Sequence, residues 1–254
     1  MLIFLVGLLF AATTAAFAAE DKLIKLDTRP GVSVSVYTMM RDGAAATVVL
    51  LPGNIGDIEL KDDVPTHDNF LVRSRDLFAA RGFNVAVVNR PSDKELEYEF
   101  RISPEHMQDL RRVVGTMKKD SGVPVWLVAT SRGTVSAAAA TIAFGNGELA
   151  GLVLTSSVTS LKRMGAVPAQ KLEAIRIPVL VIHHQKDACA VTVPRDVPRI
   201  MNGLKNAPVK KLIMVDGGAN AAGDPCGNQH WHGYVGMEKE AVDIIADWIK
   251  NPKP

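Results

Sequence analysis

Residues 125–138 read VWLVATSRGTVSAA and join two different patterns. The first five residues are apolar, as in a buried strand, and the last ones are small and favour a helix. Between them lies Ser131, with Ala129 two positions before it and Gly133 two positions after it. A nucleophilic serine in a tight strand-to-helix turn needs small residues at both places, because larger ones would clash with the strained backbone. The same serine could instead be a helix N-cap, and this stretch alone leaves both interpretations open.

Similar apolar segments recur along the chain and alternate with helix-like segments. The expected strands lie at residues 32–37, 47–51, 84–88, 125–129, 152–154, 179–182 and 211–215. The expected helices lie at residues 70–81, 103–119, 133–144, 193–203 and 234–250. This alternation predicts an α/β fold, with a mostly parallel central sheet and helices on both faces. The interval between residues 154 and 179 is too short for a large lid domain.

The overall composition limits the classes of function. The chain has 254 residues, of which 47% are hydrophobic and 22% are charged, as in a globular protein with a sizeable core. The formal net charge is only +2 and no run is rich in Lys or Arg, which argues against a nucleic-acid partner. No linker is visible, so we expect a single domain over residues 20–254.

The N-terminal segment differs from the rest of the chain. Residues 1–19, MLIFLVGLLFAATTAAFAA, carry no charged side chain and end in a small-x-small pattern. This predicts a signal peptide and therefore an exported protein, periplasmic or secreted, with no stable membrane insertion after cleavage. An uncleaved N-terminal anchor is the alternative, because the segment lacks a Lys/Arg-rich start and nearly reaches the ~20 residues that span a bilayer.

Two later segments can supply partners for a nucleophilic serine. Asp187 follows an expected strand through a short turn, which places a carboxylate at the carboxyl edge of the sheet. His232 lies on a loop just before the last expected helix. A serine hydroxyl is a weak nucleophile that needs a base and a third group to orient that base. The order Ser131, Asp187, His232 is the chain order of the triad in α/β hydrolases.

Other residues near these positions are weaker candidates. His230 competes with His232 for the role of the base. Asp224 is a second candidate acid, but no expected strand places it at the sheet edge. His183 and His184 are of a residue type that binds metals, yet adjacent residues at a strand end point in different directions and no further ligand cluster is evident. We therefore predict no metal and no cofactor.

The chain contains two cysteines, Cys189 and Cys226. An even number of cysteines in an exported protein permits one disulfide, with two buried thiols as the alternative. Cys189 lies two residues after Asp187, and Cys226 lies six residues before His232. A bridge between them would tie the loop of the acid to the loop of the base, and we expect this bridge.

Four stretches resemble the α/β-hydrolase superfamily and, within it, a group of small exported bacterial serine hydrolases. They read NFLVRSRDLFAARGF, VWLVATSRGT, VLVIHHQKDAC and HWHGY. The resemblance extends over essentially the whole region after the leader. It implies that Ser131 is the nucleophile, Asp187 the acid and His232 the base.

The resemblance also implies an oxyanion hole made of two backbone N–H groups. One belongs to Arg132, directly after the nucleophile, and the other to Asn54, with Ile55 as the alternative. Many relatives have His-Gly where this chain has Pro52-Gly53. Gly53 still allows the backbone to approach a substrate closely.

These residues predict a serine hydrolase that cleaves carboxylic esters of a small-molecule substrate. A peptidase or amidase with the same triad is one alternative, and a non-catalytic hydrolase-like binding protein is another. Arg90, Arg101 and Arg132 could face a substrate carboxylate, but we expect them to be solvated or ion-paired.

Overall fold

A computed structural model of the chain describes residues 21–254. The predicted signal peptide at residues 1–19 lies outside the described residues. Within the described part, no helix combines the length and the apolar character needed to cross a membrane.

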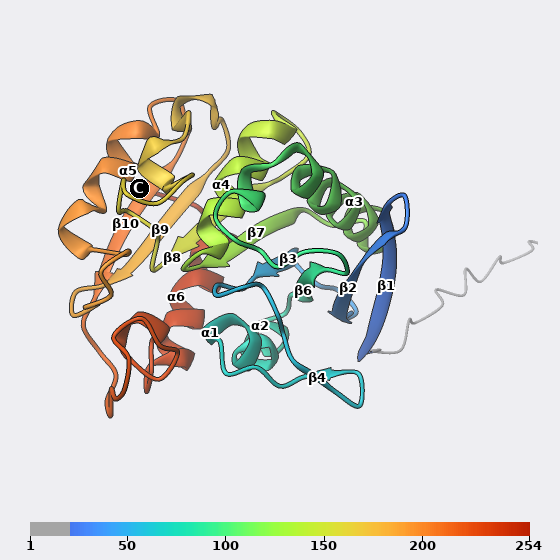
Figure 1. Cartoon of the computed structure of the whole chain (residues 1–254), viewed down its shortest axis with the longest axis horizontal. Coiled ribbons are helices and arrows are strands. Elements are labelled where there is room, and N and C mark those ends of the chain that lie inside the picture. Colours follow the sequence, from blue (N-terminus) through green and yellow to red (C-terminus); the bar gives the residue numbers. More distant parts are fainter. Residues whose placement is uncertain (1–20) are drawn as a thin grey trace, which may run out of the picture.

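Eight strands form one sheet in the order β1-β2-β6-β3-β7-β8-β9-β10 (Figure 1). Their bounds are β1 Asp21–Arg29, β2 Val32–Met39, β3 Thr47–Leu51, β6 Asn84–Pro91, β7 Val125–Thr130, β8 Gly151–Thr155, β9 Val179–His184 and β10 Lys210–Val215. All neighbouring strands from β6 to β10 pair in parallel, and only β1 and β2 run antiparallel to their neighbours. The predicted mostly parallel sheet is therefore confirmed. A separate short hairpin consists of β4 Leu60–Lys61 and β5 Val64–Pro65.

Helices cover both faces of this sheet (Figure 1). One face carries α3 Pro104–Ser121, α4 Gly133–Phe144 and α5 Pro198–Gly203, and the other carries α1 Phe70–Arg73, α2 Arg75–Ala80 and α6 Glu238–Lys250. Successive strand residues point to opposite faces, so Val49 and Leu127 pack with the first set of helices while Val48 and Val128 pack with the second. The central strands are thus buried on both faces, which explains their continuous apolar sequence.

Two expected helices are shorter or interrupted. Ser74 separates α1 from α2, so the helix expected over residues 70–81 is two short helices. The helix expected over residues 193–203 is a 3₁₀ turn at Pro194–Asp196 followed by α5. Pro198 lacks a backbone N–H and cannot continue the preceding turn, so it starts α5 instead.

The last helix begins at Glu238, four residues later than expected. Tyr234 has φ of 58° and Gly236 has φ of 73°, and both left-handed conformations are incompatible with a continuous right-handed helix. A 3₁₀ turn, Trp231–Gly233, lies just before them. The residues after His230 therefore form a turn that carries the predicted base.

The carboxyl ends of the parallel strands meet at one edge of the sheet, and the candidate residues collect there. The backbone N–H of Ser131 donates to the carbonyl oxygen of Thr155 at 3.1 Å, and that of Ser156 donates to Ile182 at 3.2 Å. The residues that follow β7, β8 and β9 thus lie side by side. Between β8 and β9 the chain forms only two 3₁₀ turns, at Val167–Ala169 and Leu172–Ala174, and contains no lid domain.

Candidate active site

Ser131 lies in a strained turn between β7 and α4. Its φ is 52°, in the left-handed region that costs energy for a residue with a Cβ. Arg132 occupies the N-cap position of α4, and no side chain caps this helix, so the interpretation of Ser131 as an N-cap is wrong. A Cβ at position 133 would lie 2.1 Å from the carbonyl oxygen of Leu51, so Gly133 is required for α4 to start this close to β3. The turn has the conformation that exposes a nucleophilic serine at a sheet edge.

The loop after β3 packs directly against this turn. A Cβ at position 53 would lie 2.8 Å from the Cβ of Ser131, so only glycine fits there. The next residue, Asn54, has φ of 50° and lines the same cavity as Ser131. Within residues 21–254, the backbone N–H groups of Asn54 and Arg132 donate to no other group of the protein. Two donors close to Ser131 are therefore available to a ligand.

Asp187 and His232 are hydrogen-bonded across the edge of the sheet. The distance between Asp187 Oδ2 and His232 Nδ1 is 3.0 Å, and the two residues are only 5% and 3% exposed. Burial alone would raise the pKa of Asp187, but hydrogen bonds from His183 and His232 hold it below its usual range. Asp187 is therefore ionised at neutral pH and holds the proton of His232 on Nδ1.

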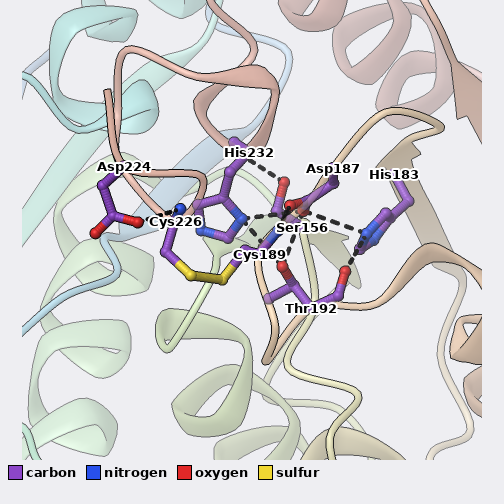
Figure 2. The surroundings of a disulfide bond; sticks show 8 residues. All are labelled: Ser156, His183, Asp187, Cys189, Thr192, Asp224, Cys226 and His232. Carbon is purple, nitrogen blue, oxygen red and sulfur yellow. Dashed lines mark hydrogen bonds and ion pairs between the residues drawn. A yellow bond between two sulfur atoms is a disulfide. The ribbon is translucent and has the colours of Figure 1, made fainter. Parts of the chain in front are cut away.

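Thr192 and His183 also surround the carboxylate of Asp187 (Figure 2). The sequence did not predict either of them as a neighbour of this carboxylate. The hydroxyl of Thr192 donates to Asp187 Oδ2 at 2.9 Å and lies 3.1 Å from His232 Nδ1. The Nε2–H of His183 donates to the carbonyl oxygen of Thr192 at 2.7 Å and lies 3.4 Å from Asp187 Oδ2. Thr192 therefore holds Asp187 and His232 together, and His183 holds Thr192.

The adjacent histidine, His184, has a different environment. Its Nε2–H donates to the carbonyl oxygen of Gly217 at 2.9 Å, and its ring stacks on Trp231. In residues 21–254, no group of three or more His, Cys, Asp or Glu side chains is placed to hold a metal ion. Both histidines are thus engaged with the protein itself.

Contacts to its backbone hold His232 in place. Ser156, which follows β8 with φ of 42°, donates its hydroxyl proton to the carbonyl oxygen of His232 at 2.8 Å. The buried hydroxyl of Tyr234 donates to Ile182 at 2.9 Å and accepts the backbone N–H of Ser156 at 3.2 Å. These contacts join the loop of His232 to the ends of β8 and β9.

The competing candidates, His230 and Asp224, have other partners, although Asp224 lines the same cavity as Ser131 and His232. His230 packs its ring edge-on against Trp231, and its buried Nδ1 has no partner. Asp224 is exposed and accepts the backbone N–H of Cys226 at 2.9 Å. Neither side chain forms a hydrogen bond or ion pair with Asp187 or His232, so the structure brings His232 and not His230 to the predicted acid.

The expected disulfide is present. Cys189 and Cys226 are joined at an S–S distance of 2.02 Å, and the bridge lies beside the ring of His232 (Figure 2). Cys189 is buried, whereas Cys226 is exposed at the rim of the site. The loop after β9 and the loop before α6 are therefore linked covalently next to the candidate base.

The site opens into a cavity of about 340 Å³ that both Ser131 and His232 line. No hydrogen bond joins Ser131 Oγ to the imidazole of His232, although both side chains face the same space. Further residues of the wall include Asn54, Tyr98, Arg132, Arg163, Cys189 and Cys226. A larger hollow of about 550 Å³, next to Arg41 and Asp120, contains none of the candidate catalytic residues.

The side chains of Arg90, Arg101 and Arg132 have different environments. Arg90 pairs with Asp57 at 3.1 Å and Arg132 pairs with Glu97 at 3.2 Å, as expected for ion-paired side chains. Arg101 is fully buried and pairs with no carboxylate of the described residues, so the expectation is wrong for this arginine. Its guanidinium instead donates to carbonyl oxygens of the loop after β3, because the chain at Phe100–Ile102 runs behind that loop.

This sheet, with a strained serine after β7, an acid after β9 and a histidine before the last helix, is the α/β-hydrolase fold. No protein-family model matches the chain, and no curated protein matches its sequence. Solved structures do match it. An esterase of Pyrococcus furiosus aligns with a TM-score of 0.67 at 15% identity, over 91% of each chain.

Two other solved structures agree. A cold-adapted esterase from an Arctic intertidal metagenomic library aligns with a TM-score of 0.63 at 12% identity, over 94% of this chain and 99% of that one. An α/β serine hydrolase homologue from Coxiella burnetii aligns with a TM-score of 0.60 at 14% identity, over 92% and 99% of the two chains. At these identities the similarity establishes the fold.

Proposed function

We propose that this protein is a serine hydrolase that cleaves carboxylic esters. In this proposal Ser131 is the nucleophile, His232 the general base and Asp187 the acid that orients the base. The observation that carries the proposal is the buried hydrogen bond between Asp187 and His232, next to a cavity that His232 shares with a strained serine.

The proposed reaction follows from the hydrogen-bond pattern. Asp187 accepts the Nδ1–H of His232, which leaves Nε2 free to accept the hydroxyl proton of Ser131 as its oxygen attacks the ester carbonyl. The negative oxygen that develops is stabilised by the N–H groups of Asn54 and Arg132. One such donor contributes roughly 3–4 kcal/mol to lowering the barrier. His232 then protonates the leaving alcohol and activates a water molecule that hydrolyses the acyl-enzyme.

A small-molecule ester is the substrate class that we favour. The cavity volume of about 340 Å³ falls within the ~300–1,000 Å³ typical of small-molecule sites. An alkoxide leaves an acyl group more readily than an amine does, and two of the similar solved structures are esterases by name. Matched ester and amide substrates with the same acyl group will separate this proposal from a peptidase or amidase.

A fluorophosphonate probe, which reacts with activated serines, tests the mechanism directly. We expect one adduct on the wild-type protein, located at Ser131 by peptide mass spectrometry, and none on Ser131→Ala. His232→Gln should lose labelling, whereas His230→Gln and the distant control Ser121→Ala should keep it. An unlabelled wild type would refute the serine hydrolase and favour the hydrolase-like binding protein.

We further propose that the protein is exported. The predicted signal peptide and the disulfide support an oxidising compartment. N-terminal sequencing of the protein recovered from the periplasm or the medium should give a start near Glu20. Recovery of an intact leader in the membrane fraction would instead support the N-terminal anchor.

A further inference from the structure

Arg101 lies in a 3₁₀ turn behind the loop that follows β3, and its residue is 0% exposed. Its Nη2 donates to the carbonyl oxygens of Asn54 at 2.9 Å and Gly53 at 3.4 Å. Its Nε donates to the carbonyl oxygen of Leu96 at 2.9 Å, and its Nη1 donates to the hydroxyl of Ser136 at 3.0 Å. The guanidinium is thus held by backbone oxygens and one hydroxyl.

A buried arginine without a carboxylate partner is costly for the fold. Burial, together with repulsion from Arg132, lowers the pKa of Arg101 to about 9, which still leaves the side chain charged at neutral pH. Other arginines of this protein have partners of opposite charge; Arg29, for example, pairs with Asp93 and Asp109. A charge removed from water without a counter-ion destabilises a folded protein, so stability does not explain why Arg101 is buried here.

The two loop carbonyls that Arg101 holds belong to the peptide groups that carry the candidate oxyanion donors. The carbonyl of Gly53 shares its peptide group with the N–H of Asn54, and the carbonyl of Asn54 shares its peptide group with the N–H of Ile55. In a trans peptide the C=O and N–H bonds point in opposite directions. With both carbonyls directed toward Arg101, the two N–H groups are directed away from it.

The opposite side of the loop faces the nucleophile. Gly53 packs against the Cβ and Oγ of Ser131, and Asn54 lines the cavity that Ser131 shares with His232. The guanidinium, the peptide groups and the cavity therefore follow one another in that order. A cation behind a peptide group also polarises its N–H, which strengthens that N–H as a donor to a negative oxygen.

A second contact joins Arg101 to the helix of the nucleophile. Ser136 lies on α4, and its hydroxyl contacts both Arg101 Nη1 and, at 3.0 Å, Nε2 of His106. Burial, with repulsion from Arg101, lowers the pKa of His106 to about 3, so this histidine is neutral and adds no second charge. Arg101 is thus anchored to α4 while it holds the loop after β3.

We propose that Arg101 is the positioning residue of the oxyanion hole: it orients and polarises the peptide groups of Gly53-Asn54 and Asn54-Ile55 and contacts no substrate itself. This inference rests on the proposed serine hydrolase mechanism. Arg101 contributes in the transition state, because only there does a full negative charge face these N–H groups. A purely structural role predicts lower thermal stability and unchanged kinetic constants.

The test compares Arg101→Met and Arg101→Lys with the wild type. We expect Arg101→Met to lower kcat for a p-nitrophenyl ester by about 10–100-fold, less than the ~10²–10³ for loss of a whole donor, with KM changed by less than about twofold. Binding of an alkylboronic acid, which forms a negatively charged tetrahedral adduct on the serine, should weaken by a similar factor. Arg101→Lys keeps the charge and should recover part of both losses.

Two further variants serve as comparisons. Ser136→Ala removes one of the contacts of Arg101 but keeps the cation, so we expect a smaller loss of kcat than in Arg101→Met. Val113→Ala creates a cavity in α3, away from the loop, and should lower the melting temperature while kcat stays at the wild-type value.

The outcomes separate the two proposals. A folded Arg101→Met with wild-type kcat and wild-type boronic acid affinity would overturn the role of Arg101. If Arg101→Met does not fold, Arg101→Lys decides, because unchanged kcat and boronic acid affinity in that variant would overturn it equally. A wild type that no fluorophosphonate labels refutes the proposed hydrolase and this role together, whereas labelling at Ser131 with unaffected Arg101 variants refutes the role of Arg101 alone.

Discussion

Cys189 and Cys226 are joined by a disulfide that links the loop of the candidate acid to the loop of the candidate base. The backbone N–H of Cys189 donates to Asp187 Oδ1 at 3.0 Å, so the bridge and the carboxylate are fixed to each other. On the other side, the bridge lies beside the ring of His232 (Figure 2). The crosslink therefore restrains the two loops whose separation would break the Asp187–His232 hydrogen bond.

Removal of the disulfide should destabilise the protein and slow the reaction. The bridge closes a segment with a sequence separation of 37, for which a crosslink contributes about 2–4 kcal/mol to the free energy of unfolding. We expect reduction, or the double variant Cys189→Ala/Cys226→Ala, to lower both the melting temperature and kcat. Thermal denaturation and ester hydrolysis with and without reductant will measure this. The double variant is the control, since reductant should leave it unchanged.

Thr192→Val should weaken the contact between Asp187 and His232 without removing either residue. The variant lacks the hydroxyl that donates to Asp187 Oδ2 and contacts His232 Nδ1. Loss of a hydrogen bond to a charged group costs about 1.5–3 kcal/mol, and each ~1.4 kcal/mol lost from the transition state lowers the rate tenfold. We therefore expect at least a tenfold lower kcat. Thr192→Ser keeps the hydroxyl and should stay within about threefold of the wild type; equal rates for the two variants would contradict this role.

Gly53→Ala should displace Ser131, the proposed nucleophile, and lower the activity. The added Cβ would lie 2.8 Å from the Cβ of Ser131, so either the loop or the serine must move. A displacement of about 1 Å can cost roughly 10²-fold in rate, and we expect a loss of at least that size in kcat. Gly115→Ala is the matched control, because a Cβ there meets nothing within 4 Å on the surface of α3. That control should retain full activity with equal or higher stability.

Acid should destabilise the wild type more than it destabilises Asp187→Asn. The pKa of Asp187 in the folded protein lies below the ordinary value of 3.8 for this side chain, so the ionised carboxylate stabilises the fold above about pH 4. This stabilisation is lost as the pH falls from about 4 through the folded-state pKa. Urea denaturation at pH 7, 5, 4 and 3 should show a steeper fall in the free energy of unfolding for the wild type. Parallel curves would show that Asp187 does not titrate with a lowered pKa.

The sequence predicted those features that depend on local patterns. Buried parallel strands are continuous apolar runs, so the strands from β3 to β10 of the main sheet were each found near their observed positions. The edge strand β1 was missed, because its residues DKLIKLDTR are mostly polar and only Thr28 among them is buried. The break at Ser74 and the late start of α6 were also missed, since both depend on packing and not on helix periodicity.

The candidate site likewise contains residues that the sequence predicts and contacts that it does not predict. Ser131, Asp187 and His232 follow or precede regular elements, and the shared carboxyl edge of a parallel sheet places such residues near one another. Local sequence patterns are therefore enough to predict the parallel sheet and to identify these three candidates. Local patterns do not predict the contacts of Arg101 or the role of Thr192.

The contacts of Arg101 and Thr192 join residues that are far apart in the sequence. Arg101 meets the loop after β3 across 47 and 48 residues of sequence, and Thr192 meets His232 across 40. No local period or spacing encodes which side chain will lie behind a given peptide group. That depends on how the strands are ordered and how closely α4 approaches β3, and a close approach permits only glycine at positions 53 and 133.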